Sequence, residues 1–222
     1  MNFFGHALIA QRREATRGLV RAEFVLGSML PDFASMLRLR PPRASLEALA
    51  RGLAFHHLTD EAFHGSHSFL EFSAEASSYL TSRGLSRGSA RAVAHVGVEL
   101  LLDSALATSS ANEAYLSAIE CALTDRVLDH IDWQVSDGKA RFTQLCTVLA
   151  RRGAVRADPP AELIAERLRN ILADRPRLAL DDAGQSVVRD WAMTTRPAVV
   201  AGAPVLLREV EQRLESASSL ER

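Results

Sequence analysis

Lysine is nearly absent from this sequence of 222 residues, in which Lys139 is the only example. Its scarcity removes most chemistries that need a lysine amine, and the chain contains no Gly-x-x-x-x-Gly-Lys phosphate loop. Cysteine is also rare, because Cys121 and Cys146 stand alone and form no Cys-x-x-Cys pair. Two isolated cysteines favour free thiols in a reducing compartment over a disulfide framework or a zinc ribbon.

Long apolar runs are missing as well. No stretch reaches the roughly 18 apolar residues of a membrane span, and the apolar segment 3–10 is too short and interrupted for a secretory signal. We therefore expect a cytoplasmic protein without a transmembrane segment. The formal charge of −1 gives the whole molecule no attraction to nucleic acid, and its arginine clusters lack interleaved aromatic residues. We predict no nucleic-acid partner.

Helical periodicity is what the sequence does contain, over nearly its whole length. No Gly/Ser-rich linker and no internal repeat divides the chain. We predict an all-α fold, a single-domain multi-helix bundle over residues 1–215 with a metal site between helices, and a frayed tail over residues 216–222. The expected helices cover residues 3–17, 19–29, 90–107, 111–130, 137–152, 159–172, 181–191 and 204–214, and a further helix runs from residue 46 into the histidine-rich segment 55–67.

Local signals set several of the expected helix ends. Ser45 and Ser89 are suitable N-caps for the helices that follow them. The punctuated segment 27–32 is expected to end the second helix, and Gly65–Ser66 is expected to end or kink the third.

Four of the seven histidines lie in residues 55–67, together with one aspartate. On a helix, His56, His57, His64 and His67 all fall within about 60° of Asp60, so five polar groups project from one face. Imidazoles and a carboxylate at i, i+4 and i+8 are the ligands that a divalent transition metal requires. The alternative is a wet helix face that happens to be rich in histidine, and the apolar residues beside the stripe favour metal.

Further ligands must come from other helices, because one helix cannot enclose a metal. His6 lies among apolar residues of the first helix, and Asp32 stands at an expected helix end. His95, Glu99 and Asp103 follow one another at i+4 steps in an otherwise apolar helix, where charge is costly unless it is paired or bound to metal. The alternatives are solvated carboxylates, a hydrogen-bonded core histidine, and cap or turn roles for the two aspartates.

Several of these motifs resemble bacterial acyl carrier protein phosphodiesterases. The similar segments are the opening Met-Asn-Phe-Phe-Gly-His-Ala-Leu-Ile-Ala, the Gly-Ser-Met-Leu-Pro-Asp-Phe segment that contains Asp32, the step from His56 to Asp60, and Glu99 with Asp103 near a helix end. The region 169–178 is similar more weakly. This resemblance implies a helical, Mn-dependent enzyme related to HD-domain phosphohydrolases.

The sequence departs from that family at His57, where arginine is usual, and at His64, where a second aspartate is usual. A second resemblance accounts for His64. Zinc-dependent phospholipase C and its relatives contain a helical His-x-x-x-Asp-x-x-x-His segment, an upstream Pro-Asp, an early histidine and a later His-x-x-x-Glu. The matching residues in this sequence are His56, Asp60 and His64, then Asp32, His6, and His95 with Glu99.

Both resemblances imply a phosphoester-cleaving metal enzyme, so we expect a phosphodiesterase that uses a metal-activated hydroxide. About one to three ions of Zn, Mn or Fe would be bound, since imidazole and carboxylate ligands suit all three metals. His57 and His67 are the candidate catalytic residues, because either can protonate a leaving oxygen near neutral pH. The candidate metal ligands are His6, Asp32, His56, Asp60, His64, His95, Glu99 and Asp103.

The expected partner is a phosphodiester substrate. The resemblances imply a phosphopantetheinylated carrier protein or a phospholipid. The alternative function is a non-enzymatic helical protein with a structural metal site or none. Structural zinc sites have four closed ligands, often cysteines. This sequence offers more than four candidates and no nearby cysteine, which favours an open catalytic site.

Overall fold

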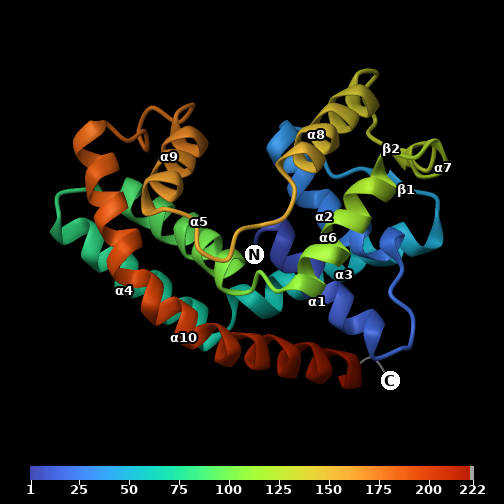
Figure 1. Cartoon of the computed structure of the whole chain (residues 1–222), viewed down its shortest axis with the longest axis horizontal. Coiled ribbons are helices and arrows are strands. Elements are labelled where there is room, and N and C mark those ends of the chain that lie inside the picture. Colours follow the sequence, from blue (N-terminus) through green and yellow to red (C-terminus); the bar gives the residue numbers. More distant parts are fainter. Residues whose placement is uncertain (221–222) are drawn as a thin grey trace. The chain divides into compact units, whose positions relative to one another are not determined.

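Ten α-helices make up nearly all the regular structure in residues 1–220, which are the residues that the computed structural model describes (Figure 1). The all-α prediction is therefore confirmed. The helices are α1 Phe3–Ala15, α2 Ala22–Leu37, α3 Glu47–His64, α4 His67–Ser82, α5 Arg87–Ala105, α6 Ser109–Ala122, α7 Asp125–Leu128, α8 Gly138–Arg152, α9 Ala161–Leu172 and α10 Asp182–Leu220. Two short strands, β1 Arg43–Ala44 and β2 Ile131–Asp132, pair in antiparallel fashion.

Proline does not end the second helix. α2 continues past Pro31 to Leu37, so the predicted end near residue 29 was wrong, and Asp32 lies inside a helix rather than at its end. A proline in a helix interior removes one backbone hydrogen bond. Buried residues lie on both sides of Pro31, including Leu30 and Phe33, and their packing offsets that loss.

The last helix shows the same behaviour. α10 runs through Pro197 and Pro204, so the two helices predicted at 181–191 and 204–214 are one. Fully buried Val199 and Val210 lie on either side of Pro204 and hold both halves against their neighbours. The helix reaches Leu220 and includes residues 216–220, for which we predicted fraying. Residues 221–222 of that predicted tail lie outside the described residues.

Three local predictions of helix boundaries were wrong, two of them because Ser45 and Ser89 make other contacts. Ser45 does not cap α3. Its backbone N–H donates to the His130 carbonyl, and its hydroxyl lies 2.7 Å from His130 Nδ1. The N-cap of α5 is Ser86, whose Oγ accepts from the Ser89 N–H. The helix predicted over 111–130 breaks after Ala122 into α6 and α7. By contrast, α3 ends at His64, as the Gly65–Ser66 signal predicted. Ser66 then caps α4, a helix that was not predicted.

The chain forms two compact units. Unit 1 contains Met1–Glu61 and Ala107–Val155, and unit 2 contains Ala62–Leu106 and Arg156–Arg222. The single domain over 1–215 remains a prediction.

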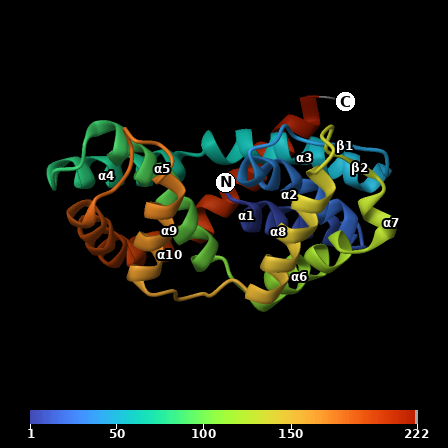
Figure 2. The ribbon, with the colours of Figure 1, turned by 90° about the horizontal axis from the view of Figure 1, so that it is seen from above.

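Unit 1 is built on three mutually packed helices, α1, α2 and α6, with α8 against α6 and α2 (Figure 2). Phe4, Phe33 and Tyr115 are fully or almost fully buried among them. Helices α2 and α3 cross at Gly27 and Gly52, where the backbones approach so closely that an added Cβ on Gly52 would lie 2.3 Å from the Phe24 carbonyl oxygen. Glycine at this crossing fixes the relative position of two helices that carry candidate ligands.

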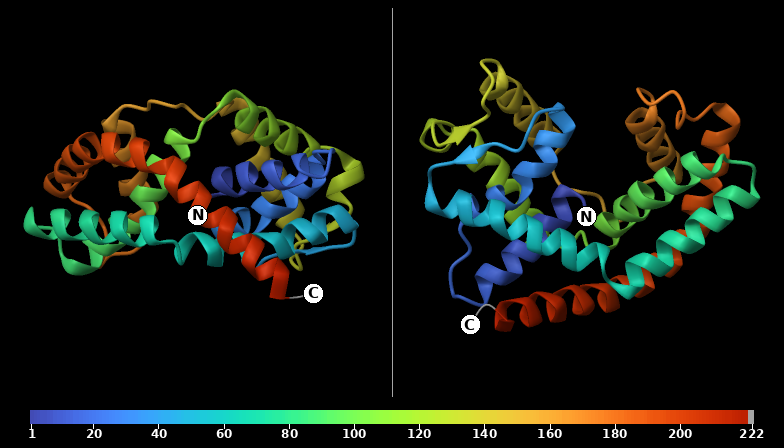
Figure 3. Two further views of the ribbon diagram at one scale, coloured as in Figure 1. Left: turned by 90° about the horizontal axis from the view of Figure 1, so that it is seen from below. Right: turned by 180° about the vertical axis from the view of Figure 1, so that it is seen from behind.

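Unit 2 packs α4, α5, α9 and α10 together (Figure 3). Its core contains the fully buried Trp191, whose ring lies against Gly97, where an added Cβ would come within 2.6 Å of it. The Glu209 carboxylate accepts from the backbone N–H and the hydroxyl of Ser68, both at 3.0 Å, and so satisfies the first turn of α4.

Within the described part of the chain, no single helix has both the length and the apolar character that crossing a membrane requires. Among the described residues, this length and apolar character are reached only by α5 and α6 taken together, and a bend of 110° separates these two helices.

Candidate metal centre

The His6 side chain in unit 1 is fully buried, and its tautomer follows from its neighbours. His6 Nδ1 lies 2.7 Å from Thr59 Oγ1. The Thr59 hydroxyl donates its only proton to backbone carbonyls of the same helix, at 2.8 Å to His56 and 3.1 Å to Phe55. Thr59 Oγ1 therefore accepts from His6, so the proton of the neutral ring sits on Nδ1. The Nε2 atom of His6 is left with an available lone pair.

The same reasoning fixes the His56 ring. His56 Nδ1 lies 2.9 Å from the Ser28 carbonyl oxygen, which can only accept. Nδ1 therefore carries the proton, and Nε2 again presents a lone pair. The rings of His6 and His56 stack with their centroids 3.9 Å apart. Histidines that bind metals are commonly held by a hydrogen bond from the other ring nitrogen, as both of these are.

Carboxylates face the His6 lone pair. His6 Nε2 lies 3.7 Å from Asp60 Oδ1 and 3.9 Å from Asp32 Oδ2, which is longer than a hydrogen bond. His6 Nε2 is buried and has no hydrogen-bond partner among the described residues. The terminal ammonium of Met1 donates to Asp60 Oδ1 at 3.1 Å. A lone pair directed at carboxylate oxygens is electrostatically unfavourable, and a cation between them removes the conflict.

Burial keeps both imidazoles neutral at physiological pH. Removal from water lowers the pKa of His6 from 6.5 to about 3, against the opposing influence of Asp60. The pKa of His56 is also lowered, again mainly by burial. Neutral imidazole is the form that coordinates metal.

We call His6, His56 and Asp60 the first cluster. One ligand atom from each residue lies within 4.8 Å of the others, so the group can hold a metal ion. The Asp60 side chain is 41% exposed, which gives this buried pair of histidines an opening to solvent. Asp32 contributes a carboxylate beside His6, but it is not one of these three converging ligands.

His64, His95 and Glu99 form the second cluster, which lies in unit 2 and meets the same 4.8 Å criterion. Both His64 Nε2 and His95 Nε2 lie 3.3 Å from Glu99 Oε1. The two rings stack in parallel with centroids 4.9 Å apart, and the Phe69 ring packs edge-on to each of them. This cluster is more open than the first, because the His95 side chain is half exposed.

The electrostatics of the second cluster favour a charged carboxylate. Burial by itself would raise the pKa of Glu99, but the pKa lies below its ordinary value, and the hydrogen bond with His64 is the largest of the influences that lower it. An ionised carboxylate with two imidazoles is a suitable ligand set for a divalent transition metal.

The remaining predicted site residues lie outside the two groups of converging ligands. Asp103 is buried in α5 but is not one of the ligands that converge on Glu99. His57 is exposed, and its ring packs edge-on to His56 with centroids 5.5 Å apart. The side chain of His67 is 85% exposed and lies 3.9 Å from Glu71. The histidine face ends at His64 because the helix ends there.

Two supporting residues were not predicted from the sequence. Thr59 and Ser28 orient His6 and His56, and the Ser28 hydroxyl is itself held by the Val25 carbonyl at 2.7 Å. A threonine three residues after His56 gives no signal of its own, because its partner lies 53 positions away in the sequence. Only its polarity within the apolar part of α3 could have drawn attention to it.

Replacing Thr59 with valine should weaken metal binding by the first cluster about 10- to 100-fold, the usual cost of losing a residue that orients a ligand. Valine has nearly the same shape but cannot accept the His6 proton, so the ring loses its preferred tautomer. Metal affinity would be measured by competition with a chromophoric chelator. Thr143→Val on α8 is the matched control, because within the described residues the Thr143 hydroxyl bonds only to the Lys139 carbonyl of its own helix. Equal affinities in both variants would contradict this role for Thr59.

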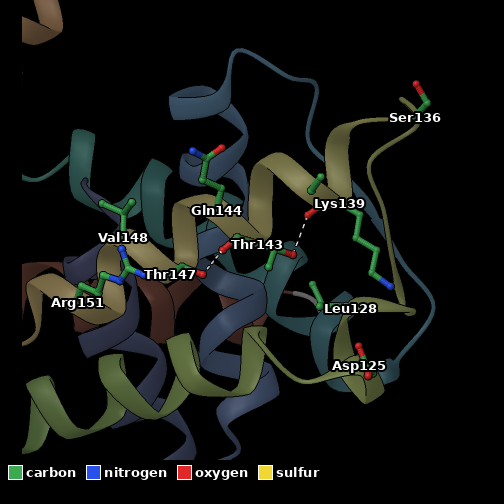
Figure 4. Close-up of a pocket in the computed structure, with 10 residues that line it drawn as sticks. Asp125, Leu128, Ser136, Lys139, Thr143, Gln144, Thr147, Val148 and Arg151 are labelled. Atoms are coloured by element: carbon green, nitrogen blue, oxygen red, sulfur yellow. Dashed lines mark hydrogen bonds between the residues drawn. The ribbon is translucent and has the colours of Figure 1, made fainter.

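A cavity of about 830 Å³ in unit 1 lies beside α8 (Figure 4). Its lining hydroxyls on Thr143 and Thr147 bond back to carbonyls of the same helix, and Lys139 pairs with Asp129 at 2.7 Å. No histidine lines it. The two clusters of histidines and carboxylates, which lie outside this cavity, are the candidate metal sites.

Comparisons with known proteins give no independent guide. No family model matches the chain, and neither the curated proteins nor the solved structures provide a match.

Proposed function

We propose that this chain is a metal-dependent phosphoesterase that cleaves phosphodiesters. The observation that carries the proposal is the first cluster, in which two neutral imidazoles with fixed tautomers present their Nε2 lone pairs where carboxylates converge. Such an arrangement suits a divalent cation better than it suits a metal-free core.

The residues that would hold metal are His6, His56 and Asp60 in unit 1, and His64, His95 and Glu99 in unit 2. A cation bound there would act as a Lewis acid and lower the pKa of a bound water. Imidazole and carboxylate ligands are compatible with Zn, Mn or Fe.

Catalysis is favoured over a purely structural metal by the openness of both clusters. Asp60 and His95 are 41% and 50% exposed, whereas structural sites are closed and often contain cysteine. Both free cysteines lie elsewhere in the sequence and belong to neither cluster.

The surrounding residues have separable roles in this proposal. Thr59 and Ser28 keep the Nε2 atoms of His6 and His56 deprotonated, and Asp60 supplies negative charge at the solvent-facing side. Exposed His57, next to His56, is the candidate for protonating the leaving oxygen, since an imidazole changes charge near neutral pH. His67 is further exposed and pairs with Glu71, which makes it the weaker candidate.

The substrate class follows from the sequence resemblances. We propose a phosphodiester such as a phosphopantetheinylated carrier protein or a phospholipid, handled in the cytoplasm, where the two free thiols would stay reduced.

The test is to purify the protein without a chelator or an affinity tag, measure its metal content, and assay hydrolysis of bis-p-nitrophenyl phosphate with added Mn or Zn. We expect about one to three equivalents of metal and turnover that depends on it. Bound metal without turnover on this substrate or on a carrier-protein or phospholipid diester would favour a structural role instead. Absence of metal under any supplementation would overturn the proposal.

A further inference from the structure

A cavity of about 370 Å³ lies in unit 2, where the turn between α4 and α5 meets the segment that leads into α10. Arg83 and Arg177 line it from these two sides, together with the hydroxyl-bearing Ser86 and Ser89. Neither metal cluster contributes a residue to it. The cavity therefore needs a separate explanation.

The two arginines have no carboxylate partner within 4 Å among the described residues. Arg83 packs over the Tyr79 ring at 5.3 Å, which restricts its side chain without neutralising its charge. Arg169, in the same unit, is by contrast paired with Asp182 at 2.9 Å. Two arginines without a carboxylate partner in the lining of one cavity favour an anionic ligand.

One acid, Asp181, also lines the cavity. Its Oδ1 accepts from the Gly184 N–H at 2.7 Å, so its charge is engaged at the first turn of α10. The lining therefore contains two positively charged arginines and one negatively charged aspartate. The aspartate is already stabilised by its position at the start of α10. A net positive charge remains for a ligand.

The other polar groups match an anion with several oxygens. Ser89 is buried, and its hydroxyl lies 3.0 Å from that of Ser86, so the pair can turn a proton outward. Small residues keep the space open, because Gly84 and Gly184 line the cavity without side chains. A phosphate group accepts from several donors at once, and a guanidinium fork matches two of its oxygens.

We propose that this cavity binds a phosphate group, either as free inorganic phosphate or as the terminal phosphoryl group of a small organic molecule. Arg83 and Arg177 hold the anion, and the serine hydroxyls complete its hydrogen bonding. This binding is independent of the metal clusters and does not rest on the proposed hydrolase activity.

The test is calorimetric titration of the full-length protein with inorganic phosphate and with butylphosphonate, which has no ester bond to cleave. Wild-type protein should show saturable binding, and Arg83→Ala and Arg177→Ala should each weaken it about 10-fold or more. Tighter binding of inorganic phosphate identifies the free ion as the ligand, and tighter binding of butylphosphonate identifies an organic phosphate. Saturable binding of succinate but of neither phosphorus compound would overturn the proposal.

Matched variants separate this cavity from the metal sites. Arg189→Ala removes an exposed arginine of the same unit that pairs with Asp190, and it should leave phosphate binding unchanged. Asp60→Ala, which disrupts the first cluster, should also leave it unchanged. Loss of binding in Asp60→Ala but not in the arginine variants would place the anion at the metal cluster and overturn the inference.

Because Arg83 and Arg177 are exposed, their variants should keep the wild-type circular dichroism. The double variant Arg83→Lys/Arg177→Lys keeps both positive charges, so it should bind phosphate more tightly than the double alanine variant.

Discussion

Asp60→Ala should abolish tight metal binding by the first cluster and lower metal-dependent phosphodiester hydrolysis about 100-fold or more. Asp60 is the only carboxylate among the three converging ligands of that cluster, so its loss leaves two neutral imidazoles. Without the negative charge, the remaining ligands cannot compensate for removing a divalent cation from water. Metal content per chain and turnover on bis-p-nitrophenyl phosphate would be measured on the same preparation.

The fold should survive this substitution. The Asp60 side chain is 41% exposed, and alanine is favourable within a helix, so the helical circular dichroism should stay at the wild-type level. Asp129→Ala is the control, because Asp129 is an exposed carboxylate paired with Lys139 in the same unit. Full metal content and activity in Asp60→Ala would show that the first cluster is not the metal site.

The second large effect concerns the crossing of α2 and α3. Gly52→Ala should destabilise the protein by about 2–4 kcal/mol. An added Cβ would lie 2.3 Å from the Phe24 carbonyl oxygen and 2.8 Å from the Gly27 Cα atom. Both neighbours are backbone atoms and cannot rotate away, so the helices must separate.

Close packing and helix propensity predict opposite changes in stability for Gly52→Ala. Helix propensity alone predicts that replacing glycine with alanine stabilises a helix by about 1 kcal/mol. Unfolding by urea, followed by circular dichroism, would measure the change. Ala54→Val adds two methyl groups at an exposed position of the same helix and should change stability by less than about 1 kcal/mol. A Gly52→Ala variant as stable as wild type would refute close packing at the crossing.

The same crossing links stability to the site. α2 carries Ser28 and Asp32, and α3 carries His56 and Asp60, so separating the helices pulls the His56 ring from the Ser28 carbonyl. We therefore expect any folded Gly52→Ala protein to bind metal more weakly as well.

Much of the fold was predictable from sequence because periodicity and turn residues act locally. The 3.6-residue pattern identified α1, α8 and α9 with nearly correct bounds, and Gly65–Ser66 correctly marked the end of α3. The proline-containing helices were not predictable in this way. Pro31 in α2 and Pro204 in α10 are tolerated because buried neighbours on both sides hold the helix together, and that burial is a property of the packed molecule.

The sequence by itself determined which residues could act as ligands, since the spacing of His56 and Asp60, and of His95 and Glu99, places each pair on one helix face. Only the tertiary structure decided how the ligands group. It added His6 to the first pair and His64 to the second, and it left His67 outside both groups. It also decided that His6 and His56 keep their Nε2 lone pairs, because Thr59 and the Ser28 carbonyl take the protons on Nδ1. Those contacts join residues 53 and 28 positions apart, which no local pattern specifies.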